Sequence, residues 1–315
     1  MKPLVILNPN SQGGRTGKHA EDIALVVERY LGPIELVQTN APRHATELAR
    51  SATIDGRKKL VVVGGDGTMH EVVNGVMAAG GDPEQRPTIG LVGQGTGGDF
   101  RKTLGIEHHL EKYCLALASR RHRSVDVMRM TYRDRAGDAT SGYCVNILSA
   151  GMGGLVDEYV AASDKRFGGT AAYLSASARA LLNNEVGRLM VTLDPNTSEE
   201  KKLELSTRLI AICNGRFFGG GMEMAPMAKP DDGWLDIISL GSAPKPQFAI
   251  SMLAIYRGTH IDNPDVAVHR ARRLVVELAN DEVRDRFPLD VDGEPLGTLP
   301  LEVEVMPAAV SVCIP

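Results

Sequence analysis

LVVVGGDGTMHEVVNG, residues 60–75, has the pattern of a strand, a tight glycine turn and a helix. Four apolar residues lead into Gly64, Gly65 and Gly67, and the helical pattern begins after Thr68, the predicted N-cap. Glycines let backbone N–H groups approach a ligand closely, and the N-terminus of the helix directs its unpaired N–H groups to the same point. The stretch therefore predicts a phosphate-binding turn.

Asp66 distinguishes this turn from an ordinary connection between a strand and a helix. A carboxylate at the position of a bound phosphate would repel it unless the carboxylate held a cation or received a proton. The pattern therefore favours a nucleotide accompanied by Mg²⁺.

Strand and helix patterns alternate around this stretch. Further apolar runs occupy residues 3–7, 34–39 and 88–92, and apolar residues recur at helical spacing in residues 18–30 and 45–51. This alternation predicts a doubly wound parallel sheet in an α/β nucleotide-binding domain, residues 1–125. Asn8 and Thr39 lie where the first two strands end, which is the edge at which such sheets bind ligands.

A second glycine turn follows the strand at residues 88–92. In GQGTGGDFRKTLG, residues 93–105, Gly95 and Thr96 lie among other glycines at the same predicted sheet edge as the first turn. Two phosphate-compatible turns on one edge are more specific than either alone. Asp99 could cap the following helix or contact a ligand, and the sequence leaves both options open.

Length, charge and cysteine content restrict the class of protein. The 315-residue chain is long enough for two domains, and its net charge of −4 gives no broad basic surface, so nucleic acid is not expected as a partner. Four scattered cysteines and the absence of a signal-peptide pattern fit the reducing cytoplasm. No apolar stretch approaches the ~20 residues of a transmembrane helix, so any contact is expected to be peripheral, at the inner membrane surface. The oligomeric state is left open, with a homodimer as one option.

Beyond about residue 124 the sequence becomes rich in strand patterns. Strands are predicted at residues 125–132, 142–148, 188–193, 203–213, 234–240 and 273–278. Helical patterns occupy residues 169–182 and 246–256. We therefore expect a β-rich second domain, residues 126–297, packed closely on the first.

Three turns in this second half carry polar residues. NGRFFGGGMEMAP, residues 214–226, could be only a wide surface loop, and KPDDGWLD, residues 229–236, is most simply a hairpin turn. LDVDGEPL, residues 289–296, is also hairpin-like. It places the carboxylate of Glu294 beside a glycine turn, a position from which a general base can be presented into a cleft.

With GGDGT, NGRFFGGG, DDGWLD and DGEPL in this order, the sequence resembles the diacylglycerol kinase catalytic-domain family, which includes bacterial lipid kinases and sphingosine kinases. GGDGT alone is shared with NAD kinases, and the later motifs narrow the choice. The resemblance covers nearly the whole chain. It implies an NAD kinase-like α/β domain that binds ATP, a β-sandwich domain for a lipid substrate, and a C-terminal tail, about residues 298–315, that returns to the first domain.

Carried over position by position, the resemblance also implies site residues. The implied ATP-binding residues are Asn8, Thr39, Gly64, Gly65, Asp66, Gly67, Thr68, Met69, His70, Gly95 and Thr96. Glu294 becomes the proton acceptor, and Asp66 would act through Mg²⁺ or through hydrogen bonds that shape the site. A structural Mg²⁺ is implied at Asp232 with the backbone carbonyls of Lys229 and Trp234, because an all-oxygen ligand set suits this ion.

Three glycines depart from the family pattern. Gly93 replaces a proline and Gly98 an asparagine in the second glycine turn, and Gly153 stands where the family's Gly-x-Asp motif has its aspartate. These changes could alter the choice of substrate or the way a metal is held.

The leading hypothesis is phosphoryl transfer from ATP to a hydroxyl group of diacylglycerol or a related lipid, such as a sphingoid base. The alternative enzyme is a kinase of NAD or another soluble metabolite, although this does not explain DDGWLD and DGEPL together. The alternative from another class is a nucleotide-regulated lipid-binding protein without catalysis, motivated by Gly98 and Gly153.

Overall fold

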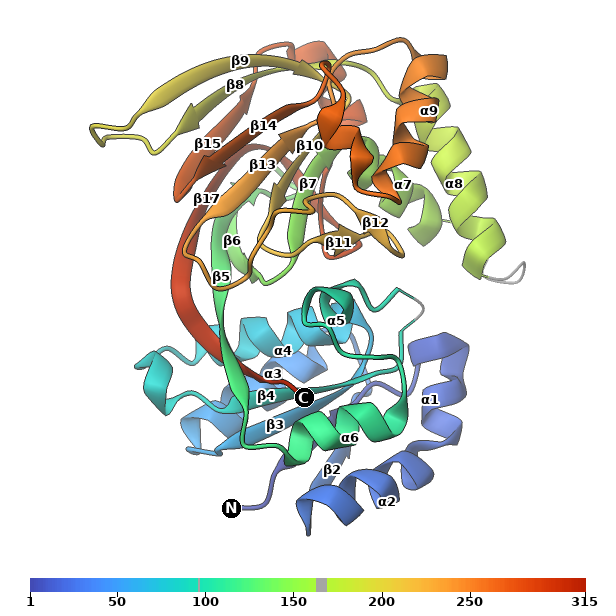
Figure 1. Cartoon of the computed structure of the whole chain (residues 1–315), viewed down its shortest axis with the longest axis vertical. Helices are drawn as coiled ribbons and strands as arrows, with labels where there is room; N and C mark the ends of the chain where they lie inside the picture. The colour runs from blue at the N-terminus through green and yellow to red at the C-terminus, as the bar shows by residue number, and fades with distance from the viewer. Residues whose placement is uncertain (96, 163–168) are drawn as a thin grey trace.

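The computed structural model describes residues 1–95, 97–162 and 169–315, and the chain forms an α/β part and a β-sandwich part (Figure 1). The α/β part comprises β1 Leu4–Leu7, α1 Arg15–Lys18, α2 Ala20–Leu31, β2 Glu35–Gln38, α3 His44–Ile54, β3 Lys59–Gly64, α4 Asp66–Ala78, β4 Thr88–Gly93, α5 Asp99–Thr103 and α6 Leu110–Ala118. The sandwich part comprises β5 His122–Arg133, β6 Ala139–Cys144, β7 Ile147–Gly151, α7 Met152–Ala161, α8 Gly169–Asn183, β8 Gly187–Leu193, β9 Lys201–Thr207, β10 Leu209–Cys213, β11 Phe217–Phe218, β12 Met222–Glu223, β13 Leu235–Ser239, α9 Lys245–Ile255, β14 Ala267–Ala271, β15 Arg273–Leu278, β16 Leu289–Val291 and β17 Glu294–Cys313.

The first four strands pair in parallel in the order β4-β3-β1-β2. Helix α3 packs on α4 and α2 packs on α6, and Figure 1 shows these two pairs on opposite faces of the sheet. Because both faces are covered, β1 is a continuous run of buried apolar residues, as is β3 after its first residue. The predicted doubly wound α/β fold is confirmed.

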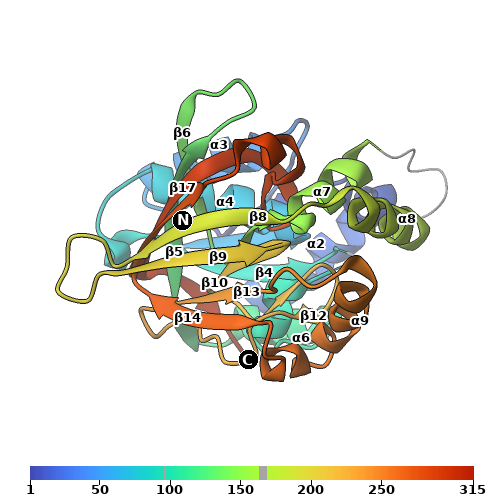
Figure 2. The same ribbon diagram turned by 90° about the horizontal axis from the view of Figure 1, so that it is seen from above.

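The sandwich consists of two antiparallel sheets with an apolar core between them. One sheet has the order β14-β13-β10-β7-β16, and the other contains β9, β8, β15, β17, β5 and β6. Leu148 and Ile210 of the first sheet share a buried cluster with Leu274 and Val303 of the second. Helices α7, α8 and α9 gather along one side of the sandwich in both views (Figures 1 and 2).

Strand β17 connects the two parts. It pairs antiparallel with β5 over most of its length, and near its end Val312 pairs in parallel with Ile89 of β4. The C-terminal residues therefore belong to the same sheet as β3 and β4, the strands that lead into the glycine turns. Strand β5 itself runs through the boundary expected at residue 125.

Two segments that were predicted as single strands are each divided in the structure. Residues 142–148 are split because the chain leaves β6 in one sheet at Val145 and Asn146 and enters β7 in the other. Residues 203–213 are split at Arg208 in the same way. An apolar pattern continues through such a crossing, since the strands on both sides face the same core.

The predicted hairpin at Asp232-Gly233 is wrong. Gly233 has a φ of +73° and the turn leads into β13, but the preceding strand, β12, ends at Glu223 and pairs with β11. The residues 289–296 do form a hairpin, between β16 and β17. Among the helices that the structure describes, none has the length and apolar character to cross a bilayer.

Candidate active site

The two glycine turns touch each other at the carboxyl edge of the parallel sheet. A Cβ atom on Gly95 would stand 2.7 Å from the Cα atom of Gly65, and one on Gly65 would stand 3.3 Å from the Cα atom of Gly95. No side chain fits between backbones this close. The turns that the sequence placed on one edge therefore form a continuous backbone surface.

Asn8 holds the end of β1 against the first of these turns. Its backbone N–H donates to the carbonyl of Val63 at 2.9 Å, and its side-chain Nδ2 donates to the hydroxyl of Thr68 at 3.1 Å. Thr68 is buried and is not the N-cap, because α4 begins at Asp66 and Gly65 is its N-cap. The prediction placed the helix start too late because Gly67, which looked like part of the turn, is already helical.

Asp66 joins the first turn to the second. Its carboxylate accepts the backbone N–H of Asp99 at 3.1 Å and that of Phe100 at 3.3 Å, the first residues of α5. Burial, followed by the charge of Asp99, raises the pKa of Asp66 to about 6, although these backbone hydrogen bonds act in the opposite direction. These two hydrogen bonds hold the start of α5 beside the first glycine turn.

Asp99 occupies the first position of α5 rather than the N-cap. The N-cap is Gly98, whose φ of +59° is the left-handed conformation that asparagine also tolerates. The replacement of asparagine by Gly98 therefore fits the same backbone. The carboxylate of Asp99 instead accepts the Nζ of Lys102 at 3.0 Å and the backbone N–H of Gly220 at 2.8 Å.

Glu294 approaches the first turn from the sandwich part. The turn residues Asp292 and Gly293 have φ values of +50° and +85°, and the hairpin brings Glu294 over the start of α4. A Cβ atom on Gly67 would stand 2.7 Å from Oε1 of Glu294. The side chain keeps access to solvent. Desolvation by the surrounding protein nevertheless raises the pKa of Glu294, the charges of Glu71 and Asp292 add to the rise, and His70 opposes it. The fold thus brings Glu294 close to Gly67, although the two residues are far apart in the sequence.

His70 links α4 to the same hairpin. Its Nδ1 lies 3.2 Å from Oδ2 of Asp292, and the other carboxylate oxygen of Asp292, Oδ1, accepts the backbone N–H of Ile147 at 3.2 Å. Burial alone would lower the pKa of His70, but the hydrogen bond and charge of Asp292, together with Glu294 and Glu71, raise it overall. When it is protonated, the imidazole of His70 lowers the pKa of Glu294 and so favours the ionised carboxylate.

A buried pair of carboxyl groups lies next to this hairpin. Asp157 on α7 hydrogen-bonds Asp290 on β16, and Asp290 also accepts the hydroxyl of Ser149. Burial, followed by the charge of Asp290, raises the pKa of Asp157 well above its ordinary value, so the pair retains a proton near neutral pH. Asp157 was missed by the sequence analysis, and its only signal was its place one helical turn after Gly153.

Gly153 has no room for a side chain. A Cβ atom there would stand 2.3 Å from the hydroxyl oxygen of Ser149 and 2.8 Å from a carboxylate oxygen of Asp290. The space beside Gly153 is therefore filled by Ser149 and Asp290, so an aspartate at residue 153 would require these side chains to move.

A cavity of about 210 Å³ lies against the second glycine turn. Backbone of Gly95 and Gly97 lines it together with the side chains of Arg101, Lys102 and His108. Backbone N–H groups with neighbouring cations are suited to phosphate. Arg101 and Lys102 were not predicted, although two cations directly after a glycine turn were visible in the sequence. Thr96, which was predicted here, lies outside the described residues.

Tyr113 accounts for the other departure in this turn. A Cβ atom on Gly93 would stand 2.4 Å from the hydroxyl oxygen of Tyr113, which lies 2.8 Å from Nδ1 of His108. A proline at residue 93 would displace this tyrosine. The position of the Tyr113 hydroxyl therefore requires a residue without a side chain at position 93.

Two predicted ATP-binding residues lie apart from this centre. Thr39 follows β2, two strands away from β3, and its backbone N–H donates to Leu7 at 2.8 Å. Met69 is buried in the core of the α/β part, so its side chain is not available to a ligand. The predicted residues gathered with Asp66 and Gly67 are Asn8, Gly64, Gly65, Thr68, His70, Gly95 and Glu294.

The loop at residues 214–226 is more than a wide surface loop. The backbone N–H of Arg216 donates to the hydroxyl of Thr103 at 3.0 Å, and Gly220 contacts Asp99 as described above. The β11–β12 hairpin thereby holds α5 against the sandwich part.

The predicted structural Mg²⁺ site does not fit the side chains as they are arranged. Asp232 is paired with the guanidinium of Arg270 at 2.6 Å and also accepts the backbone N–H of Trp234 at 3.1 Å. Arg270 contacts Asp236 as well, at 3.0 Å. The only carboxylate of the implied ligand set is already neutralised. Among the described residues, no three His, Cys, Asp or Glu side chains are grouped as metal ligands.

EDTA is therefore expected to leave the thermal unfolding midpoint of the nucleotide-free protein unchanged, within about 1 °C. Differential scanning fluorimetry with and without added Mg²⁺ measures this. A Mg²⁺-dependent rise of several degrees in the wild type would show that the ion displaces Arg270. Arg270→Gln is the matched variant, because it leaves the Asp232 carboxylate without its cation.

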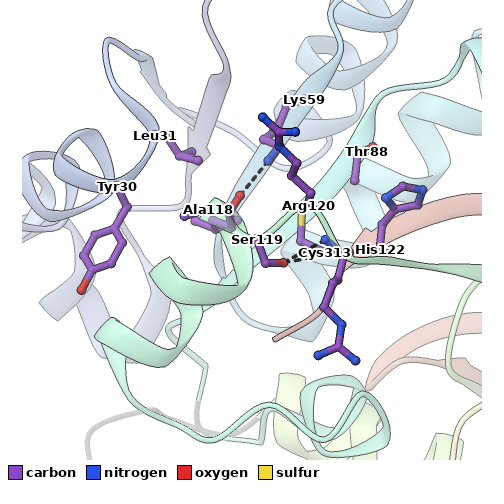
Figure 3. Close-up of a pocket in the computed structure, with 11 residues that line it drawn as sticks. Tyr30, Leu31, Lys59, Thr88, Ala118, Ser119, Arg120, His122 and Cys313 are labelled. Atoms are coloured by element: carbon purple, nitrogen blue, oxygen red, sulfur yellow. Dashed lines mark hydrogen bonds between the residues drawn. The ribbon is translucent and has the colours of Figure 1, made fainter.

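A second, larger cavity, about 430 Å³, lies elsewhere (Figure 3). Lys59 and Thr88 line it at the amino ends of β3 and β4, together with Arg120 and His122. The Nζ of Lys59 donates to the backbone carbonyl of Leu117 at 2.7 Å. This is the sheet edge opposite the glycine turns, so the cavity is separate from the candidate active site.

Comparisons with known proteins agree with this arrangement. The family model described as diacylglycerol kinase catalytic domain matches residues 2–130, and the YegS C-terminal NAD kinase beta sandwich-like domain matches residues 146–314. The diacylglycerol kinase of Staphylococcus carnosus is 27% identical over 306 residues, covering 94% of this chain and 89% of the relative. The "Probable lipid kinase YegS-like" protein of Pseudomonas syringae pv. syringae is 30% identical over 275 residues, covering 86% and 80%.

A crystal structure of a diacylglycerol kinase from Bacillus anthracis str. Sterne shares the fold. It has a TM-score of 0.71 and 20% identity, with coverage of 100% of this chain and 97% of that one. The first family model covers the α/β part, which carries the glycine turns. The second covers the sandwich part, which carries Glu294. The chain belongs to the diacylglycerol kinase catalytic-domain family, a family of lipid kinases.

Proposed function

We propose that this protein transfers the γ-phosphoryl group of ATP to a hydroxyl group of diacylglycerol or a related lipid, with a sphingoid base as a further possible acceptor. The observation that supports this most directly is the position of Glu294, whose carboxylate lies over Gly67 at the start of α4. A carboxylate presented from one part of the chain to a phosphate-compatible turn of the other suits phosphoryl transfer to an alcohol.

The phosphates of ATP would lie along the joined glycine turns, where backbone N–H groups, Arg101 and Lys102 can neutralise charge. Mg²⁺ bound with ATP would supply further charge neutralisation. Asp66 would hold α5 at the correct distance through its two backbone hydrogen bonds. Phosphoryl transfer depends on positioning and charge more than on covalent catalysis.

Glu294 would orient the acceptor hydroxyl and take its proton as the oxygen attacks phosphorus. His70, held by Asp292, would favour the ionised form of Glu294 before the reaction. We place this reaction in the cytoplasm, where ATP is available, with the lipid reached at the inner membrane surface.

A screen with [γ-³²P]ATP tests the proposal. Diacylglycerol, a sphingoid base, extracted lipids and NAD are supplied side by side with Mg²⁺ and detergent, and labelled products are separated by chromatography. A labelled lipid supports the proposal and identifies the acceptor. Labelled NAD would favour the soluble-metabolite kinase. ATP-dependent lipid binding with no labelled product under any condition would favour a binding protein without catalysis.

The rate is expected to fall at acid pH. A general base acts in its ionised form, and the pKa of Glu294 is raised above 4.5 while that of Asp66 is raised to about 6. Lowering the pH through these values protonates both groups, so kcat/KM should decline below about pH 6. A pH–rate profile with the best acceptor measures this. A rate that stays constant down to pH 4.5 would contradict a role for either ionised carboxylate.

A further inference from the structure

The outer face of α9 exposes apolar side chains that the fold leaves uncovered. Ile250 is 71% exposed, Leu253 69% and Tyr256 52%, and Leu182 at the end of α8 is 73% exposed. The Nζ of Lys245 donates to the carbonyl of Leu182, so the end of α8 lies at the start of α9. We call these four residues, Leu182, Ile250, Leu253 and Tyr256, the α9 face.

Helix α9 is apolar on both sides, which is unusual for a surface helix. Phe248 and Ile255 are buried against the sandwich, while Ile250 and Leu253 follow one another at helical spacing on the outside. A helix that is apolar all round is normally buried on all sides. The outer side of α9 therefore lacks a partner among the residues that the structure describes.

The charged residues within α9 and just after it are cations, whereas the acidic residues Glu185 and Asp262 follow α8 and α9 in the sequence. From residue 237 to residue 261 the sequence contains Lys245 and Arg257 but no Asp or Glu, although the whole chain has a net charge of −4. Residues 169–184 likewise contain Arg179 and no acidic residue. An apolar stripe edged by cations is complementary to the surface of a bilayer that contains anionic lipids.

The α9 face is also connected to the candidate active site. Helix α8 packs on both α9 and α7, and Arg179 of α8 lies over the ring of Tyr159 of α7, 4.3 Å from its centroid. From α7, Asp157 hydrogen-bonds Asp290, which stands four residues before Glu294. Figure 1 shows these three helices on one side of the sandwich.

We propose that the α9 face is the surface by which this protein docks on an anionic lipid bilayer. The choice of a bilayer as the occupant rests on the proposed lipid kinase function, since an acceptor lipid must be reached in a membrane. Ile250 and Leu253 insert among the acyl chains near the headgroups, and Lys245 and Arg257 face the anionic headgroups.

Vesicle sedimentation with the full chain tests this proposal. Vesicles of phosphatidylcholine with and without phosphatidylglycerol are compared for the wild type and for Ile250→Glu/Leu253→Glu. The double variant is expected to bind at least about tenfold more weakly to both kinds of vesicle. Leu25→Glu is the matched control, because Leu25 is 65% exposed on α2 and its replacement should leave binding unchanged.

A second variant tests the charge. Arg257→Gln is expected to weaken binding about threefold on vesicles with phosphatidylglycerol and not on phosphatidylcholine alone, and added salt should remove the difference. Circular dichroism checks that both variants are folded. Equal vesicle binding by the wild type and the double variant would overturn the proposal. A second outcome would also overturn it: the wild type is a dimer, the double variant is a monomer, and vesicle binding is unchanged. A second copy of the chain would then cover the α9 face.

An activity assay separates this inference from the proposed function. With a short-chain diacylglycerol dissolved in water, the double variant should keep the wild-type rate, whereas with vesicles as substrate it should lose most of it. If the wild type phosphorylates no lipid but the double variant still loses vesicle binding, the proposed function is contradicted. The docking surface is then still supported. Lipid phosphorylation on vesicles at equal rates by both proteins would contradict the docking surface alone.

Discussion

Glu294→Gln is expected to lower kcat by about 10²- to 10⁴-fold while leaving the dissociation constant of ATP within about twofold of the wild type. The substitution keeps the size of the side chain that faces Gly67 but removes the ability to accept a proton. Because Glu294 belongs to the sandwich part and lies over Gly67 at the start of α4, the ATP-binding backbone should be little affected. Steady-state kinetics with the labelled lipid product and fluorescence titration with a nucleotide analogue measure the two quantities.

Glu304→Gln is the matched control for this prediction. Glu304 lies on the same strand, β17, and forms an exposed ion pair with Arg129, so its replacement should change kcat by less than about twofold. A Glu294→Gln variant with an undiminished rate would exclude Glu294 as the base. A large loss in both variants would indicate a general effect on β17 instead.

Gly95→Ala is expected to weaken ATP binding by about tenfold or more and to lower the free energy of unfolding by about 1–3 kcal/mol. The added Cβ would stand 2.7 Å from the Cα atom of Gly65. Backbone cannot move aside as a flexible side chain can, so the two glycine turns would be forced apart. Urea unfolding and nucleotide titration measure the two effects.

Gly97→Ala is the control in the same turn. A Cβ atom at residue 97 would have its nearest neighbours, carboxylate oxygens of Asp66 and Asp99, at 3.4 Å, which is an ordinary contact. Gly97→Ala should therefore change stability by less than about 0.5 kcal/mol. If the two alanine variants behave alike, the contact between the turns does not contribute to the site.

Short-range patterns in the sequence were sufficient for the architecture and for part of the site. The apolar runs before Asn8, Gly64 and Gly93 predicted parallel strands, and parallel strands bring their carboxyl ends to one edge. The Asp292-Gly293 turn predicted the hairpin that presents Glu294. In each case the information lies within about ten neighbouring residues, at the spacing of one strand, turn or helix.

Features that depend on distant partners could not be predicted from local patterns. Asp232 looks like a metal ligand in its own loop, and only the fold brings Arg270 from β14 to neutralise it. Gly153 looked like a lost functional aspartate, but the structure fills its space with Ser149 and Asp290. The strand breaks at Asn146 and Arg208 are equally invisible locally, because both sides of each break face one core.

The sequence by itself therefore determined the class of fold, the glycine turns at one sheet edge and the residue types that they require. The tertiary structure alone decided that Gly65 and Gly95 touch, that Asp66 is satisfied by the N–H groups of α5, and that Glu294 lies over Gly67. The physical reason is that periodicity and turn chemistry act between neighbours in the chain. Charge pairing, steric exclusion and the closing of one part on the other act between residues that only folding brings together.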